Sequence, residues 1–179
     1  TGLECGVISG HVQPGDTVAI VGCGPIGLSA LLAAQFYSPA EVIMIDIDDN
    51  RLDVSKAMGA THTINNTDGR AAEKVMALTG QKGVCQAIVA AGGHIANIGV
   101  HGKPVQLNLD KLWSHNITLT TRLVDTVTTP LLMKMVASGQ IRPKQLITHR
   151  FRLDEVMQAY DTFGNAMKER ALKILIVND

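Results

Sequence analysis

Three glycines and one acidic residue have the types and the spacing to bind a ligand that contains phosphate. The glycines form the pattern G-x-G-x-x-G, at Gly22, Gly24 and Gly27. They follow an apolar run at 18–21 and precede a stretch rich in Ala and Leu at 28–37, which indicates a buried strand, a turn and a helix. Asp46 ends a second apolar run, 19 residues after Gly27.

Each of these residue types has a physical role in a dinucleotide-binding turn. The first glycine makes the tight turn, the second lets the backbone approach a pyrophosphate, and the third lets the helix pack closely on the strand. The N-terminus of the helix offers free N–H groups and a partial positive charge to the phosphates. An acid about 20 residues further on accepts hydrogen bonds from ribose hydroxyls, and Asp46 stands there. Glycines alone would also be compatible with an ordinary turn that binds no ligand.

The elements that must position these residues alternate along the chain. Strands are expected at 17–21, 41–45 and 61–65. Helices are expected at 28–37, 51–58 and 71–78. This alternation is typical of an α/β fold with a doubly wound parallel sheet.

The alternation breaks after residue 80. Residues 81–84 should lead into a fourth strand and its turn, but 85–91 already have the pattern of a helix end. A strand of about five residues and its turn are therefore missing. We expect a missing segment between Val84 and Cys85, either deleted or disordered.

The other expected elements are a short helix within 1–11 and a set of later strands and helices. The later strands are expected at 94–99, 105–109, 117–123, 147–151 and 172–177. The later helices are expected at 130–138 and 153–163. We place a domain boundary after Val124, with a dinucleotide-binding domain at 1–124 and a separate C-terminal segment at 125–179.

Composition excludes several classes of function. Hydrophobic residues make up 46% of the chain, which is enough for a sizeable core. The 16 basic and 16 acidic residues balance, so that no charge footprint indicates nucleic acid or an anionic membrane. No apolar run is long enough to span a membrane, and no signal peptide is visible. Because the first residue is Thr1 rather than Met, we expect the natural N-terminus to lie upstream.

The cysteines and histidines do not have the spacing of a disulfide framework or a metal site. Three cysteines, Cys5, Cys23 and Cys85, form no C-x-x-C pair, and the six histidines are dispersed. This number and spacing of cysteines is typical of a protein in a reducing, cytoplasmic environment. We interpret Cys23 as a small side chain that fills the glycine turn, although a thiol near a helix N-terminus can also be reactive.

With these motifs in place, the whole chain resembles the C-terminal half of a zinc-containing, medium-chain alcohol dehydrogenase. The resemblance rests on the order and spacing of several motifs, namely TG at 1–2, PGDTVAIVGCGPIG at 14–27, VIMIDIDDNRL at 42–52, MGATHTIN at 58–65, AGGHIANIGVHG at 91–102, ITHRFRLDEVMQAYDTF at 147–163 and ALKILI at 171–176.

The resemblance implies a Rossmann-type, NAD-binding fold and the NAD(P)-dependent oxidation of an alcohol to an aldehyde or ketone. In this family a catalytic zinc polarises the alcohol oxygen, but its ligands belong to an N-terminal domain that this sequence lacks. The resemblance also implies that 125–179 complete that catalytic domain, that the chain alone is inactive, and that the intact protein is a homo-oligomer, a dimer or tetramer. The strands at 105–109 and 117–123 would form the contact, since an unprotected apolar edge strand is otherwise an aggregation liability.

The resemblance also implies which residues bind the pyrophosphate and adenosine parts of NAD. The pyrophosphate would lie on the glycine turn, at Gly22, Gly24, Pro25, Ile26 and Gly27, and Ile26 would also lie behind the nicotinamide ring. Asp46 would bind the ribose, and Arg51 would flank the adenosine.

Other positions match the nicotinamide end of the cofactor. Thr1 would contact the face of the ring. The carboxamide would be held by the backbone of Ile98, Gly99 and Val100, with Leu123 and Val124 as its partners. Lys173 lies where a basic residue can approach the pyrophosphate. Arg122 departs from the small residue that the resemblance leads us to expect there.

Two other functions fit parts of the pattern. One is a nucleotide-binding regulatory or structural module without catalysis. The other is a methyltransferase, in which a glycine-rich turn and a strand-end acid bind S-adenosylmethionine. The methyltransferase is disfavoured because Gly27 belongs to the close-packing pattern of dinucleotide folds.

Overall fold

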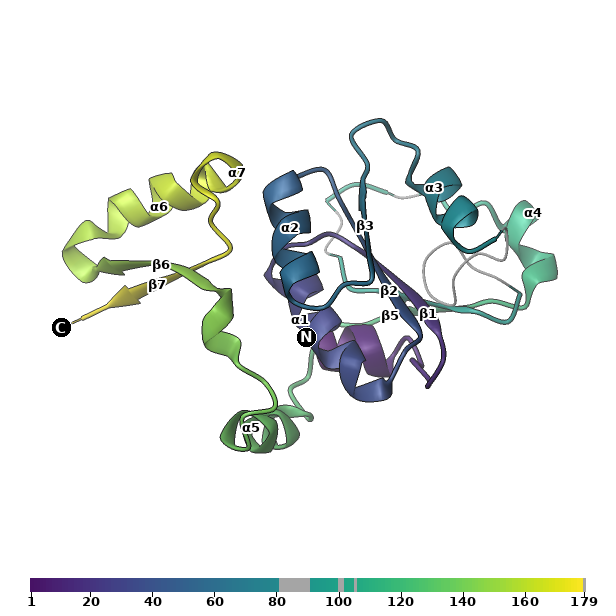
Figure 1. Ribbon diagram of the computed structural model, residues 1–179, viewed down its shortest axis with the longest axis horizontal. Helices are drawn as coiled ribbons and strands as arrows, with labels where there is room; N and C mark the ends of the chain where they lie inside the picture. The colour runs from purple at the N-terminus through teal and green to yellow at the C-terminus, as the bar shows by residue number, and fades with distance from the viewer. Residues whose placement is uncertain (81–90, 100–101, 105, 179) are drawn as a thin grey trace. The chain divides into compact units, whose positions relative to one another are not determined.

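The computed structural model describes residues 1–80, 91–99, 102–104 and 106–178. These residues form two compact units, Thr1–Thr126 and Val127–Asp179 (Figure 1). The predicted domain boundary after Val124 stays a prediction. Within the described ranges, no helix is both long and apolar enough to cross a membrane.

A three-stranded parallel sheet forms the centre of the first unit. Strand β2 (Glu41–Asp46) lies between β1 (Thr17–Val21) and β3 (His62–Asn65). The register pairs Val21 with Ile45 and Asp46 with Asn65. All three strands therefore end at one edge of the sheet, and the residues that follow them gather there. In open parallel sheets this edge is where ligands bind.

Strand β2 is buried because helices cover both faces of the sheet. Its four central side chains, Val42, Ile43, Met44 and Ile45, are at most 3% exposed, and burying such a side chain contributes about 1.5–3 kcal/mol. On one face Val75 of α3 (Ala71–Leu78) packs against Ile43 and Ile45. Figure 1 shows α2 (Asp49–Ala57) and α3 on either side of β3. This arrangement confirms the α/β class and the parallel strands.

The helices of the first unit lie close to their predicted positions. Helix α1 (Pro25–Ala34) begins three residues before the predicted start, because proline suits the first turn of a helix. A short 3₁₀ segment, η2 (Gln35–Tyr37), follows it. Helix α3 has the predicted bounds. Helix α2 begins two residues early, because the carboxylate of Asp48 accepts a hydrogen bond from Asn50 N at 2.9 Å and so caps its start.

The first residues form a π-helical segment, η1 (Gly2–Ile8), that packs closely on α1. A Cβ on Gly2 would lie 2.5 Å from the backbone nitrogen of Ala30, so that only glycine allows this approach. The helix predicted within 1–11 is therefore present in a wider helical form.

Strands β4 (His94–Asn97) and β5 (Thr118–Thr121) form a separate parallel two-stranded sheet. Helix α4 (Leu109–Leu112) and the 3₁₀ segment η3 (Trp113–His115) lie between them in the chain. Both strands were expected, although each is shorter than predicted. The expected break between Val84 and Cys85 lies outside the described residues.

The predicted strand at 105–109 is wrong where the structure describes it. Residues 106–108 have no regular structure, and Leu109 begins α4. The alternation of apolar and polar residues fits a strand, and the side chain of Gln106 donates to that of Asn108 at 3.1 Å, but this local contact does not supply the backbone pairing that a strand needs. A strand pattern without a neighbouring strand has no ladder to join.

The second unit contains a parallel pair of strands and the helices that join and precede them. Strand β6 (Ile147–Arg152) pairs with β7 (Lys173–Val177). Between the strands lie η5 (Leu153–Glu155), α6 (Val156–Gly164) and α7 (Ala166–Glu169). Before them lie α5 (Thr129–Ala137) and η4 (Pro143–Leu146). The four elements predicted in this region are confirmed to within three residues at each end.

Helix α6 packs on both strands of the second unit but leaves large apolar side chains at the surface. The exposed side chains of α6 and α7 are Met157, Tyr160, Phe163 and Met167. Only Ala159 of α6 is buried among the residues described.

Candidate dinucleotide-binding site

The glycine turn joins β1 to α1 and is built as the sequence predicts. Gly22 has a φ of +96°, which favours glycine, and its N–H donates to the carbonyl oxygen of Ile45 at 2.7 Å. That bond ties the turn to the end of β2. Gly24 is the N-cap residue of α1, and Pro25 follows at the first helical position.

The second and third glycines face different surroundings. A Cβ on Gly27 would lie 1.7 Å from the carbonyl oxygen of Gly22, so the turn closes only if residue 27 has no side chain. A Cβ on Gly24 would meet only Nη1 of Arg51, at 4.0 Å. The space over Gly24 is therefore open, and a phosphate group can approach the backbone there.

Asp46 is held at the end of β2 by backbone N–H groups. Its Oδ2 accepts from Cys23 N in the glycine turn at 2.5 Å. Its Oδ1 accepts from Ile47 N at 2.7 Å and from Asp48 N at 3.1 Å. A carboxylate has about four acceptor sites, so this half-buried group can still accept from a ligand hydroxyl. The structure thus brings Asp46 together with the glycine turn.

Cys23 fills the inside of the turn, as the sequence analysis proposed. Its side chain is fully buried. Burial raises the pKa of its thiol to about 12, and the negative charge of Asp46 adds to the increase. The thiol is therefore protonated near neutral pH and is not a nucleophile.

Arg51 lies beside the turn, on the first part of α2. Its Nε is 3.6 Å from Oδ2 of Asp48. This Nε is buried and has no hydrogen-bond partner within the described residues. The positive charge of Arg51 thus lies close to the open space over Gly24, where it would favour an anionic group.

A second group of predicted residues gathers around η1. Thr1 precedes it, and the carbonyl oxygen of Thr1 accepts from Cys5 N at 2.9 Å. Ile98 follows β4, and its Cδ1 lies 3.2 Å from where a Cβ on Gly6 would be. Leu123 and Val124 follow β5, and the next residue, Asp125, is bonded to η1 through Glu4 at 3.0 Å. Since η1 packs on α1, this group belongs to the same unit as the glycine turn.

Where it describes them, the structure does not bring the remaining predicted residues together with the glycine turn. Gly99 is exposed, directly after Ile98. Val100 lies outside the described residues. Lys173 begins β7 in the second unit, where it is exposed and pairs with Ile147.

Sequence reasoning missed Glu4, a carboxylate that is only 1% exposed. It accepts from Asp125 N and lies 3.6 Å from Nη2 of Arg122. An acid in the first turn of a short apolar helix gives no signal of burial. The unexpected Arg122 was the one indication that an acid would be near.

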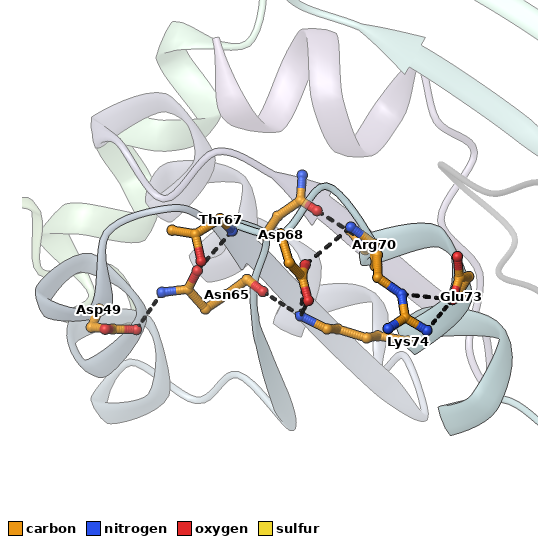
Figure 2. Close-up of polar contacts among 9 residues, drawn as sticks. Asp49, Asn65, Thr67, Asp68, Arg70, Glu73 and Lys74 are labelled. Atoms are coloured by element: carbon orange, nitrogen blue, oxygen red, sulfur yellow. Dashed lines mark hydrogen bonds and ion pairs between the residues drawn. The ribbon is translucent and has the colours of Figure 1, made fainter.

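A polar network braces the loop that follows β3 at the same sheet edge (Figure 2). The amide of Asn65 donates to Asp49 at 2.6 Å and accepts from Thr67 N at 2.9 Å. Lys74 Nζ donates to the carbonyl oxygen of Asn65 at 2.8 Å and pairs with Asp68. The Lys74 ammonium holds the pKa of the Asp68 carboxyl below its usual range. Figure 2 shows these side chains linking the start of α2 to α3.

Among the described residues, no group of three or more His, Cys, Asp or Glu side chains is placed to hold a metal ion.

A family model described as zinc-binding dehydrogenase matches residues 25–138, which include Gly27, Asp46 and Arg51. The chain belongs to the zinc-binding dehydrogenase family. This confirms the family resemblance that the sequence motifs indicated.

Solved structures and curated sequences of this family resemble the chain over almost its whole length. The structure of zinc-dependent alcohol dehydrogenase 2 from Streptococcus pneumonia, in its apo form, is 47% identical with a TM-score of 0.96, and the match covers 99% of this chain and 56% of that one. An alcohol dehydrogenase of Cupriavidus necator is 31% identical over 98% of this chain and 53% of its own length. Sorbitol dehydrogenase of Bacillus subtilis is 29% identical over 92% of this chain and 51% of its own length.

The zinc-binding dehydrogenase chain described here spans about half the length of the curated relatives that it matches. The alignment with the Cupriavidus necator protein runs over 195 positions, more than the 179 residues of this chain. That relative therefore has residues with no counterpart here. The location of a break at Val84 and Cys85 stays a prediction.

Proposed function

We propose that this chain is the NAD-binding part of an NAD- and zinc-dependent alcohol dehydrogenase. Its membership of the zinc-binding dehydrogenase family supports this function, as does its similarity to proteins described as alcohol and sorbitol dehydrogenases. The substrates would be small alcohols and the matching aldehydes or ketones.

The observation that carries the proposal is the open space over Gly24. Its backbone can be approached closely, the positive charge of Arg51 lies next to it, and α1 begins there. A helix N-terminus with free N–H groups is suited to a phosphate anion. Asp46, which is fixed to the same turn through Cys23 N, would bind the adjacent ribose.

The residues of this chain would bind and orient NAD, which when bound accepts the hydride that leaves the alcohol. The turn at Gly22, Gly24, Pro25, Ile26 and Gly27 would hold the pyrophosphate. The side chain of Ile26 is half exposed beside that turn and would exclude water from one face of the nicotinamide ring. Thr1, Ile98, Gly99, Val100, Leu123 and Val124 would surround the carboxamide end. Lys173 would approach the pyrophosphate.

The proposal includes a preference for NAD over NADP. The carboxylate of Asp46 can accept from the hydroxyls of an adenosine ribose, and it would repel a 2′-phosphate at the same position. Arg51 would partly offset that repulsion.

Zinc and the oxidation step belong to the longer protein in this proposal. The ligands of the zinc would come from a domain outside this chain, and residues 125–179 would complete that domain. We expect the 179-residue chain to show no zinc-dependent turnover. The intact protein would be a cytoplasmic homo-oligomer. Strand β5 would lie at its contact, since among the described strands β5 is paired only with β4.

Calorimetric titration of the chain with NADH, NADPH and S-adenosylmethionine tests the proposal. We expect saturable binding of NADH, weaker binding of NADPH and none of S-adenosylmethionine. A chain that binds S-adenosylmethionine and not NADH would show that the proposal is wrong. The methyltransferase and the non-catalytic module are not favoured, because the family match and the relatives are dehydrogenases.

A further inference from the structure

A buried acid connects the two ends of the first unit's chain. Glu4 lies in η1, and its Oε1 accepts a hydrogen bond from Asp125 N at 3.0 Å across 121 residues of sequence. Its side chain is 1% exposed. Burying a carboxylate is costly unless it is paired and hydrogen-bonded, so this contact is a strong constraint on the backbone at residue 125.

Arg122 supplies the balancing charge. Its Nη2 lies 3.6 Å from Oε1 of Glu4 and 2.5 Å from Oδ2 of Asp125. The hydrogen bond to Asp125 raises the pKa of Arg122, and the charge of Glu4 adds to this. The large residue at 122, which the family resemblance did not lead us to expect, thus has a defined partner in η1.

These contacts fix both ends of a two-residue segment. Residues 122 and 125 are held to η1, and Leu123 and Val124 lie between them, with Leu123 81% exposed. The contacts to Glu4 restrict this segment.

Segment η1 is itself fixed to the cofactor-binding elements. Gly2 lies against Ser29 and Ala30 of α1, and Gly6 lies next to Ile98. Thr1 stands at the start of η1. Glu4 therefore sets the position of Leu123 and Val124 relative to Thr1, Ile98 and the glycine turn.

We propose that Glu4, paired with Arg122, is a positioning residue for the nicotinamide end of the cofactor, which it serves by holding the Leu123–Val124 segment. This inference rests on the proposed function. It predicts that loss of Glu4 weakens contacts to the nicotinamide end and leaves the adenosine and pyrophosphate contacts intact.

The experiment compares NADH with ADP-ribose, which is the same ligand without the nicotinamide ring. Both are titrated calorimetrically into the 179-residue chain and into Glu4→Met, which keeps the length of the side chain and removes the acceptor. We expect Glu4→Met to weaken NADH about tenfold, as for the loss of one charge-assisted hydrogen bond, and to change ADP-ribose less than twofold. Glu4→Gln keeps an oxygen that can accept from Asp125 N, so it should retain most of the NADH affinity.

Two further variants keep the test decisive. Arg122→Met removes the more exposed partner and should show the same selective loss even if Glu4→Met does not fold. Glu73→Met breaks an exposed ion pair with Arg70 on α3 and should change neither ligand. Equal weakening of NADH and ADP-ribose in Glu4→Met would overturn the inference, because it would show a general structural role. Unchanged binding of both would also overturn it. If the parent chain binds ADP-ribose but not NADH, the proposed function fails, and this inference fails with it.

Discussion

The carbonyl oxygen of Gly22 lies 1.7 Å from the position that a Cβ on Gly27 would take. An alanine at 27 must therefore open the glycine turn, which we expect to cost about 3 kcal/mol in the free energy of unfolding. An alanine at 24 would meet only the end of the Arg51 side chain, and the φ of −72° there suits any residue.

We accordingly expect the two alanine variants to separate folding from binding. Gly24→Ala should change the free energy of unfolding by less than about 0.5 kcal/mol. It should still weaken NADH binding, because its methyl group would occupy the space proposed for the pyrophosphate. Gly164→Ala, with open space around it, is the control for both measurements. Denaturant unfolding and NADH titration check the pair. Unchanged NADH affinity in Gly24→Ala would contradict the proposed position of the pyrophosphate.

Asp46 has a structural role as well as its proposed role in binding ribose. Asp46→Ser removes the acceptor for Cys23 N and Ile47 N, so we expect both lower stability and weaker NADH binding. Loss of a hydrogen bond to a charged group predicts at least about a tenfold loss of NADH affinity. NADPH should lose less, since the repulsion of its 2′-phosphate is relieved. Asp53→Ser, at an exposed position of the same helix as Arg51, is the control. An unchanged ratio of NADH to NADPH affinities would argue against the ribose contact.

The buried thiol of Cys23 should make stability depend on alkaline pH. Its pKa is raised from 9.0 to about 12 by burial, with the charge of Asp46 adding to the effect. The folded protein thus holds the proton more tightly than the unfolded chain does. The stabilising contribution is complete below pH 9 and is lost as pH rises from 9 toward 12. At pH 10 the loss relative to pH 8 should be about 1.4 kcal/mol.

Unfolding of the chain and of Cys23→Ala at pH 8 and pH 10 isolates this contribution from other groups that titrate there. The variant should show the smaller decrease. Equal decreases in the two proteins would mean that the thiol does not titrate in this way.

The sequence predicted those parts of the site that depend on local pattern. Gly22, Gly24, Gly27 and Asp46 could be predicted because the spacing of the glycines marks a turn between a strand and a helix. Asp46 also ends the next strand, and parallel strands end at the same side of a sheet. The burial of Cys23 followed from its place inside that turn. These features need no knowledge of distant contacts.

The contacts that the sequence did not predict join residues far apart in the chain. The hydrogen bond from Asp125 N to Glu4 joins residues 121 positions apart. No periodic pattern in the sequence indicates such a contact. The prediction of a strand at 105–109 was wrong for a related reason. Its local pattern suits a strand, but the described structure gives it no neighbouring strand to pair with. Local pattern therefore predicted the glycine turn, whereas the surroundings of Leu123 and Val124 depend on tertiary contacts that no local pattern indicates.

The last prediction concerns the network at the end of β3. Asn65 bonds to Asp49 through its amide nitrogen and to Thr67 N through its amide oxygen. Asn65→Ala removes both exposed bonds, and we expect a loss of about 1 kcal/mol in the free energy of unfolding. NADH affinity should change less than twofold, because Asp46 keeps its backbone bond to Asn66 N. Asn65→Asp keeps the acceptor for Thr67 N but places a second carboxylate next to Asp49. It should be less stable than the parent at low salt and recover part of that loss at 1 M salt, where like charges repel less. Denaturant unfolding at both salt concentrations measures the difference, and a loss that salt does not change would show that the contact to Asp49 is not electrostatic.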